Sequence, residues 1–296
     1  MAARSKPPKP ENQHILRGEV LARERVSPHM LRVTVGGGEL GTGFTARGWD
    51  QWFRLFVPRP GQDALHLPGS VTLRGYAHYL AMPESRRPLL RNYTVRASRP
   101  GQIDIDLVSH GDLTATTPSA AGWAARCEVG SPVALLDEGL GWAGDDTRDW
   151  TFVVADESGL PAALGVLASL PDDARGLALL EVPTAEDVQP VVAPAGVEVR
   201  WLARDDHHAV PGVLALRTAV GVTLPPGRPY AFVVGEQALA AGVRRHLVAQ
   251  GVDKGDVTFC GYWRHGARRG PVTHRAARDV HRAATGACTA APGCGV

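Results

Sequence analysis

The hexapeptide Arg91-Asn92-Tyr93-Thr94-Val95-Arg96 contains the residue types in this chain that could carry the most specific chemistry. On a strand, Arg91 and Tyr93 share one face, while Thr94 faces the other way or follows a local bend. A flavin dinucleotide needs a cation for its diphosphate, a flat aromatic surface for its ring and a small hydroxyl near N5. The hexapeptide could supply all three groups. The alternative is an edge strand with a solvated arginine and a half-buried tyrosine.

A second candidate region follows the segment that ends at Val108. His110 comes next, and Thr117-Pro118-Ser119 then begins a short helical segment. Free N–H groups at a helix start, with hydroxyls beside them, can bind an anion. An ordinary N-cap with proline in the first turn explains the same residues, and alone it is the better explanation. A lone histidine is more often packed or solvated than a ligand.

The turn Asp156-Glu157-Ser158-Gly159 joins a buried strand to a helix. Ligands of open α/β sheets bind at the carboxyl ends of the strands, where this turn lies. Ser158 and Gly159 would permit close approach of a phosphate or a ribose. Asp156 and Glu157 would hinder a phosphate but could accept hydrogen bonds from ribose hydroxyls. A plain capping box is the equally supported alternative.

Two further segments follow later strands. Gly235-Glu236 repeats the strand-then-turn position, and Tyr262-Trp263-Arg264 comes directly after the expected last strand. Adjacent aromatic residues there point in opposite directions, which is awkward for a core. One of them could cover a flavin or nicotinamide ring while Arg264 meets an anionic group.

The first half of the chain indicates an antiparallel barrel, because short β-branched or alternating segments are separated by Gly and Pro. The long connection 62–88 looks irregular, and 119–126 is the one helical segment. The expected strands are Glu19–Arg25, Met30–Val35, Gln51–Val57, Arg91–Ala97, Ile103–Val108 and Val133–Leu136.

From Asp149 onwards, strands and helices alternate, which is typical of a parallel α/β sheet with right-handed crossovers. The expected strands are Trp150–Ala155, Leu177–Val182, Val197–Trp201, Tyr230–Val234 and Val257–Cys260; the expected helices are Leu160–Leu170, Pro211–Ala219 and Gln237–Gln250. We therefore predict a disordered lead-in over 1–12, an antiparallel Greek-key β-barrel domain over 13–142, a parallel α/β nucleotide-binding domain over 149–270 and a partly disordered extension over 271–296.

Composition excludes several other classes. The 296 residues carry 32 basic and 30 acidic side chains, which gives a formal charge of +2. A charge so close to zero does not favour binding to nucleic acid. No apolar run approaches the roughly 20 residues of a bilayer-spanning helix. The cysteines fit neither a zinc signature nor a disulfide framework, which favours a reducing, cytoplasmic compartment. Cys127 and Cys260 are expected to be buried thiols, and we expect no metal site and a monomer.

The order of these motifs resembles the siderophore-interacting protein family, the FAD-dependent ferric-siderophore reductases of the ferredoxin-reductase-like group. The resemblance covers about residues 26–266. It rests on Val26–Thr34, Asp50–Pro58, RNYTVR at 91–96, HGD at 110–112, Trp123-Ala124, DESGLPA at 156–162, Gly235-Glu236, Val243–Leu247 and GYWRHG at 261–266. The family's basic siderophore-docking residues, often lysines, have no clear counterpart in this chain.

The resemblance implies a role for each candidate residue. Tyr93 and Thr94 would lie at the reacting ring of a bound FAD. The remaining flavin contacts would be Arg91, Val108, His110, Thr117, Pro118 and Ser119. The nicotinamide dinucleotide, NADH or NADPH, would lie against Asp156, Glu157, Ser158, Gly159, Gly235 and Glu236, with Tyr262, Trp263 and Arg264 beside the ring.

We therefore expect a cytoplasmic NAD(P)H-dependent flavoprotein that reduces ferric siderophores. A general flavin reductase, an electron-transfer flavoprotein with another acceptor and a non-catalytic siderophore-binding protein are the alternatives. An arginine near the end of the second α/β strand would favour NADPH, because it could bind the 2′-phosphate. Arg200 and Arg204 are the candidates, and the sequence alone does not choose between the two donors.

Overall fold

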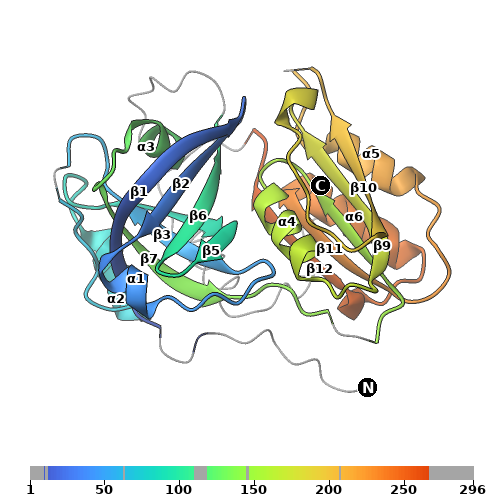
Figure 1. Ribbon diagram of the computed structural model, residues 1–296, viewed down its shortest axis with the longest axis horizontal. Helices are drawn as coiled ribbons and strands as arrows, with labels where there is room; N and C mark the ends of the chain where they lie inside the picture. The colour runs from blue at the N-terminus through green and yellow to red at the C-terminus, as the bar shows by residue number, and fades with distance from the viewer. Residues whose placement is uncertain are drawn as a thin grey trace.

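Seven antiparallel strands form the first half of the computed structural model, which describes residues 10, 13–62, 64–109, 119–144, 147–206 and 208–266 (Figure 1). The strands are β1 (Leu16–Ser27), β2 (Met30–Gly36), β3 (Trp52–Val57), β4 (Leu89–Thr94), β5 (Ala97–Arg99), β6 (Gln102–Val108) and β7 (Pro132–Gly139). The expected extension 271–296, nearly all of the lead-in 1–12, and His110, Thr117 and Pro118 lie outside the described residues.

The barrel sheet has the strand order β4-β3-β7-β1-β2-β6-β5. It curls so that its two ends meet, because the Arg96 N–H after β4 donates to the Asp104 carbonyl on β6 at 2.9 Å. Alternation along β6 turns Ile103, Ile105 and Leu107 into the core, where each is at most 1% exposed. The short helix α3 (Ala120–Arg126) adds Trp123 to the same core.

A parallel five-stranded sheet of order β10-β9-β8-β11-β12 forms the second half. Its strands are β8 (Trp150–Ala155), β9 (Arg175–Val182), β10 (Gly196–Ala203), β11 (Pro229–Glu236) and β12 (Val257–Trp263). The helix α4 (Leu160–Ser169) covers the face of this sheet toward the barrel, whereas α5 (Val213–Gly221) and α6 (Gln237–Ala249) cover the other face (Figure 1). The predicted fold class, an antiparallel barrel followed by a parallel α/β sheet, is confirmed.

A shared core joins the two halves. Met30 and Val108 of the barrel pack into the cluster formed by α4 and the face of the sheet beneath it. Trp49 stacks on Trp142 with ring centroids 4.9 Å apart, and its backbone N–H donates to the Ser169 hydroxyl at the end of α4. These apolar contacts and this hydrogen bond position the carboxyl edge of the parallel sheet against the barrel.

Several expectations were wrong in detail. The connection 62–88 is not wholly irregular, since it contains the helix α2 (Leu73–Ala81), and α1 (Gly38–Gly43) was not anticipated. The expected strand over 91–97 is divided between β4 and β5 where the chain crosses to β6. The last strand continues to Trp263 instead of ending at Cys260, and Cys260 is exposed because β12 lies at the edge of the sheet. No described helix is long and apolar enough to cross a bilayer.

Candidate functional site

Arg91 extends from β4, the terminal strand of the barrel sheet. β4 pairs only with β3, with Arg91 opposite Leu55. The exposed guanidinium donates to the Leu90 carbonyl at 2.7 Å, and within the described residues no carboxylate is paired with it. A carbonyl orients a guanidinium without neutralising its charge, so Arg91 remains able to bind an anion.

Tyr93 and Thr94 lie at the other end of β4, opposite Phe53 and Trp52. The Tyr93 ring is half-buried against the barrel core, whereas Thr94 is buried. The Thr94 side chain lies close enough to the hydroxyl of Tyr262 to hydrogen-bond with it, and Tyr262 comes from β12 of the parallel sheet. This contact joins the predicted flavin strand to the predicted nicotinamide edge, 168 positions away in the sequence.

Tyr262 has an exposed ring and an enclosed hydroxyl. The residue is 42% exposed, yet burial of its hydroxyl raises the tyrosine pKa well above its usual value. The negative charges of Asp50 and Asp156 act in the same direction, and the hydrogen bond with Thr94 opposes them. Tyr262 is therefore a neutral hydrogen-bonding group, and its ring presents a flat surface at the junction of the two halves.

Val108 and Ser119 flank the undescribed segment that contains His110, Thr117 and Pro118. Val108 packs against the core shared by the two halves. The Ser119 hydroxyl accepts a hydrogen bond from the Gly122 N–H at 3.0 Å, so it serves as the N-cap of α3. In the structure, the Ser119 hydroxyl therefore acts as a helix cap, as the alternative interpretation predicted.

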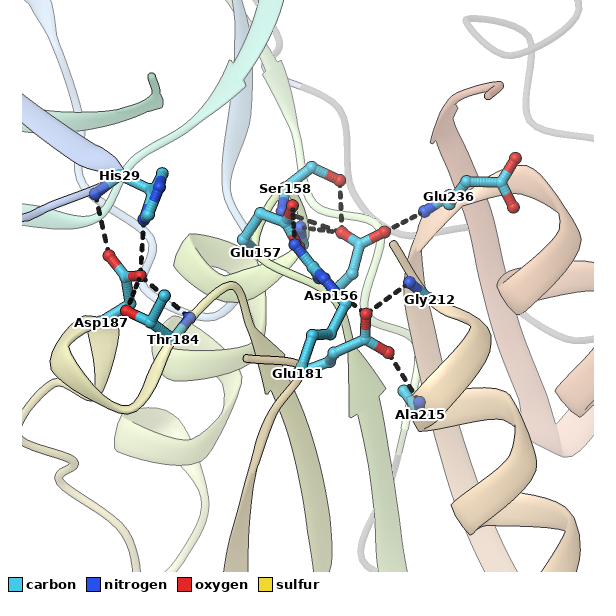
Figure 2. A network of polar contacts seen from close by, with 12 residues as sticks. His29, Asp156, Glu157, Ser158, Glu181, Thr184, Asp187, Gly212, Ala215 and Glu236 are labelled. Carbon is cyan, nitrogen blue, oxygen red and sulfur yellow. Dashed lines mark hydrogen bonds and ion pairs between the residues drawn. The ribbon is translucent and has the colours of Figure 1, made fainter. Parts of the chain in front are cut away.

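Asp187 of the α/β half holds the barrel turn that precedes β2 (Figure 2). Its carboxylate accepts from the Ser27 hydroxyl at 2.7 Å and from the His29 N–H at 2.9 Å, and it pairs with His29 Nδ1 at 2.7 Å. The His29 carbonyl in turn accepts from the Ser109 N–H at 2.9 Å. Asp187 therefore fixes the place where the segment after Val108 begins. Sequence reasoning missed it, because no local motif marks a partner 158 positions away.

The carboxylate of Asp156 accepts hydrogen bonds from other residues of the protein, as Figure 2 shows. One oxygen accepts from the Ser158 N–H at 2.8 Å and from the Ser158 hydroxyl at 2.6 Å, and the other accepts from the Glu236 N–H at 2.6 Å. Burial raises the pKa of Asp156 to about 6, and the charge of Glu157 adds to this shift. The carboxyl thus ties together the ends of β8 and β11, and its oxygens are already engaged.

The two predicted glycines serve packing in this structure. A Cβ on Gly159 would lie 2.6 Å from the Val234 carbonyl oxygen, so glycine lets the start of α4 approach β11. Gly235 has a φ of 134°, and a Cβ there would lie 2.6 Å from the Asp156 carboxyl. Both positions need glycine for the protein's own backbone, whether or not a ligand is bound.

Glu236 caps α6 and holds the chain after β12. Its carboxylate accepts from the N–H groups of Ala238 and Leu239 at the helix start and from the His265 N–H at 3.1 Å. Trp263 is half-buried and Arg264 is exposed. Glu236 therefore fixes the position of the segment that carries Tyr262, Trp263 and Arg264.

Glu157 and Arg204 form a buried ion pair that also includes Glu181. The Arg204 guanidinium lies 2.7 Å and 2.9 Å from the two oxygens of Glu157 and 2.7 Å from Glu181, and its side chain is 6% exposed. Glu181 also accepts from the N–H groups of Gly212 and Ala215, at 2.7 Å and 2.6 Å (Figure 2). Burial by itself would lower the pKa of Arg204, but the two carboxylates raise it above its usual value.

Thr94 and Tyr262 meet at the junction of the barrel and the carboxyl edge of the parallel sheet, which makes this junction the candidate site. Arg91, Tyr93 and Thr94 follow one another along β4, and Tyr262 approaches Thr94 from the other half. Spacing along a strand, about 3.3 Å per residue, separates the backbone positions of Arg91 and Thr94 by about 10 Å. A flavin dinucleotide needs its diphosphate partner and its ring partners separated in this way, so the residues fit FAD. No cluster of metal-ligating side chains occurs within the described residues.

A curved antiparallel sheet followed by a parallel α/β sheet is the ferredoxin-reductase-like fold. Family models cover both halves. Residues 19–141 match the siderophore-interacting FAD-binding domain, and residues 148–266 match the siderophore-interacting protein model. The chain belongs to the siderophore-interacting protein family.

Individual relatives agree with this assignment. The chain is 30% identical over 253 residues to the ferric vibriobactin reductase of Vibrio cholerae, covering 84% of this chain and 89% of that protein. It is 29% identical over 248 residues to the NADPH-dependent ferric-chelate reductase of Escherichia coli, covering 82% and 91%. A siderophore utilization protein from T. fusca has a similar structure, with a TM-score of 0.71 and 28% identity, covering 89% of this chain and 97% of that one.

Proposed function

We propose that this protein is an FAD-dependent reductase of ferric siderophores that takes its electrons from a reduced nicotinamide dinucleotide. One observation carries the proposal: Thr94 of the barrel meets Tyr262 of the parallel sheet, and the strand of Thr94 also bears Arg91, which pairs with no carboxylate among the described residues. The names of two relatives, a ferric vibriobactin reductase and a ferric-chelate reductase, support the same activity.

Each residue of β4 would bind a different part of the cofactor. Arg91 would bind the FAD diphosphate, because a guanidinium matches phosphate oxygens in charge and geometry. Tyr93 would pack on the flavin, and the Thr94 hydroxyl would hydrogen-bond to N5. FAD, when bound, supplies the ability to accept a hydride and pass on single electrons.

Tyr262 would cover the ring from the side of the parallel sheet. Its hydroxyl remains protonated because its pKa is raised by burial, so it adds no negative charge to the site. The iron chelate is the substrate. Ferrous iron would leave because hard oxygen ligands bind it much less tightly than ferric iron.

We place the reaction in the cytoplasm, where reduced nicotinamide dinucleotides are available. Both sides of the proposed site come from a single chain, so a monomer suffices. Size-exclusion chromatography with light scattering tests whether the protein is a monomer. A mass equal to one 31.5 kDa chain is expected.

The decisive experiment starts from the purified protein reconstituted with FAD. It should be yellow, and its flavin absorbance should bleach when NADH or NADPH is added without oxygen. Ferric hydroxamates, ferric catecholates and ferric citrate should then restore the oxidised spectrum, with ferrozine trapping Fe(II). Failure to bind FAD would overturn the proposal. Bleaching without reoxidation by any iron chelate would point to another electron acceptor.

A further inference from the structure

The arginine that would bind the 2′-phosphate of NADP is already paired with carboxylates of the protein itself. In open α/β folds, an acidic side chain near the end of the second strand binds the ribose 2′-hydroxyl of NAD, whereas a nearby arginine accommodates the 2′-phosphate of NADP. In this chain the second and third strands are β9 and β10, which run side by side with Glu181 opposite Leu202. Arg204 follows β10 directly. Because β10 runs beside β9, Arg204 lies near the end of the second strand, where an arginine for the 2′-phosphate is expected.

Two glutamates hold Arg204 away from solvent. Glu157 binds it through both carboxylate oxygens and Glu181 binds it through one, all within 2.9 Å. The three side chains are 6%, 2% and 0% exposed. Releasing Arg204 toward a phosphate would leave two buried carboxylates without their cation, which is strongly unfavourable.

The residues after Arg204 add further negative charge. Asp205 and Asp206 are exposed, and Asp206 accepts a hydrogen bond from the His208 N–H at 2.8 Å. Carboxylates at such a position repel a phosphate dianion and can accept hydrogen bonds from ribose hydroxyls. Arg200, the other candidate, lies earlier on β10 and pairs with Glu198 on the same strand at 2.7 Å.

We infer that the α/β half selects NADH over NADPH, through the Glu157–Arg204–Glu181 cluster and the carboxylates of Asp205 and Asp206. This inference rests on the proposed use of a nicotinamide dinucleotide. It differs from what the name of the Escherichia coli relative states for that protein, so it concerns residues of this chain and not the family.

Binding measurements test the inference without depending on turnover. Titration calorimetry of the FAD-loaded protein with NAD⁺ and with NADP⁺ should give a dissociation constant at least about tenfold lower for NAD⁺, since one charge-assisted hydrogen bond is worth about that factor. Equal affinities, tighter binding of NADP⁺ or no binding of either nucleotide would overturn the inference.

Two variants test the cause. Glu157→Gln should release part of Arg204 and reduce the preference for NAD⁺ by roughly threefold or more. Asp206→Asn, at an exposed position, should act in the same direction without disturbing the buried cluster. The matched control is Glu198→Gln, which removes the same charge and frees an arginine on the solvent face of β10. An unchanged preference in both test variants, or an equal change in the control, would refute the assignment.

The outcome also separates this inference from the proposed function. Tighter NAD⁺ binding without anaerobic bleaching of the flavin by NADH would support the specificity of the site and overturn the proposed hydride donor. Bleaching by NADPH at lower concentrations than by NADH would support the donor class and overturn the specificity.

Discussion

On the barrel side of the site, Arg91 is held by a backbone carbonyl and Thr94 by a hydroxyl from the opposite half. On the sheet side, Glu157 and Asp156 have protein partners for their oxygens. The barrel thus presents, at Arg91, a positive charge that no carboxylate of the described residues neutralises, whereas the carboxyl edge of the sheet uses its acids to hold loops and helices. The barrel side is suited to binding an anionic cofactor. The sheet side is suited to setting the shape of a pocket and the sign of its charge.

This difference predicts that substitutions on the two sides have different consequences. Substitution of Arg91 on the barrel side should alter cofactor affinity and leave the unfolding free energy almost unchanged. Changes at the acids of the sheet should lower the unfolding free energy even in the flavin-free protein.

The largest effect is expected for Glu181→Ala. The substitution leaves Arg204 with one carboxylate partner and removes the acceptor of the Gly212 and Ala215 N–H groups. Breaking a buried ion pair in this way costs about 3–5 kcal/mol of unfolding free energy. Urea denaturation of the flavin-free protein measures it. Glu198→Ala, which breaks the exposed pair with Arg200, is the control and should leave the unfolding free energy almost unchanged. Similar losses in the two variants would contradict the division.

Asp50 is the acid of the barrel that most resembles those of the sheet. It accepts from the N–H groups of Gly141 and Trp142 at the junction, and burial raises its pKa to about 6. The folded state therefore holds a proton that the unfolded state releases near pH 4, so this residue makes stability fall as pH rises from about 4 to 6. In Asp50→Asn this contribution, about 3 kcal/mol, should disappear.

The measurement for Asp50 is the difference in unfolding free energy between the variant and the natural protein at pH 4, 5, 6 and 7. The difference should change in favour of the variant with rising pH and level off above the raised pKa. A difference that stays constant from pH 4 to 7 would show that Asp50 titrates normally in the folded protein.

Arg91→Ala should affect the flavin and little else. Loss of a charge-assisted contact with the diphosphate should raise the dissociation constant for FAD by about tenfold or more. Flavin fluorescence quenching measures this constant. The unfolding free energy of the flavin-free protein should change by no more than about 0.5 kcal/mol, since the side chain is exposed. Arg86→Ala, an exposed arginine in the connection before β4, is the control and should bind FAD normally. Normal affinity in Arg91→Ala would remove this residue from the site.

The smallest effect is expected for Tyr262→Phe, which removes only the hydroxyl that contacts Thr94. The expected cost is about 1 kcal/mol of unfolding free energy in the flavin-free protein. A double-mutant cycle with Thr94→Val should recover a coupling energy of similar size. Additive losses would mean that the hydroxyl–hydroxyl contact contributes nothing to joining the two halves.

Much of the fold was predictable because its signals are local. The apolar run Trp150–Ala155 and the alternation along Ile103–Leu107 each reflect one strand and the faces it buries. The helix α2 was missed because it is short, contains Gly75 and follows Pro68 and Gly69. The extent of β12 was also misjudged. It continues to Trp263 because β11 runs beside it, and the sequence of β12 does not contain that information.

The sequence by itself determined the order of barrel and α/β sheet, the family, and the strand that carries Arg91, Tyr93 and Thr94, since strand periodicity and motif order are properties of contiguous residues. Only the tertiary structure decided what the acids of the sheet do. Asp156 is engaged by the Glu236 N–H, and Glu157 by Arg204, because the strand order places β8 between β9 and β11. Partners so distant in sequence leave no local signal, so ligand-binding and structural carboxylates could be told apart only after the chain was folded.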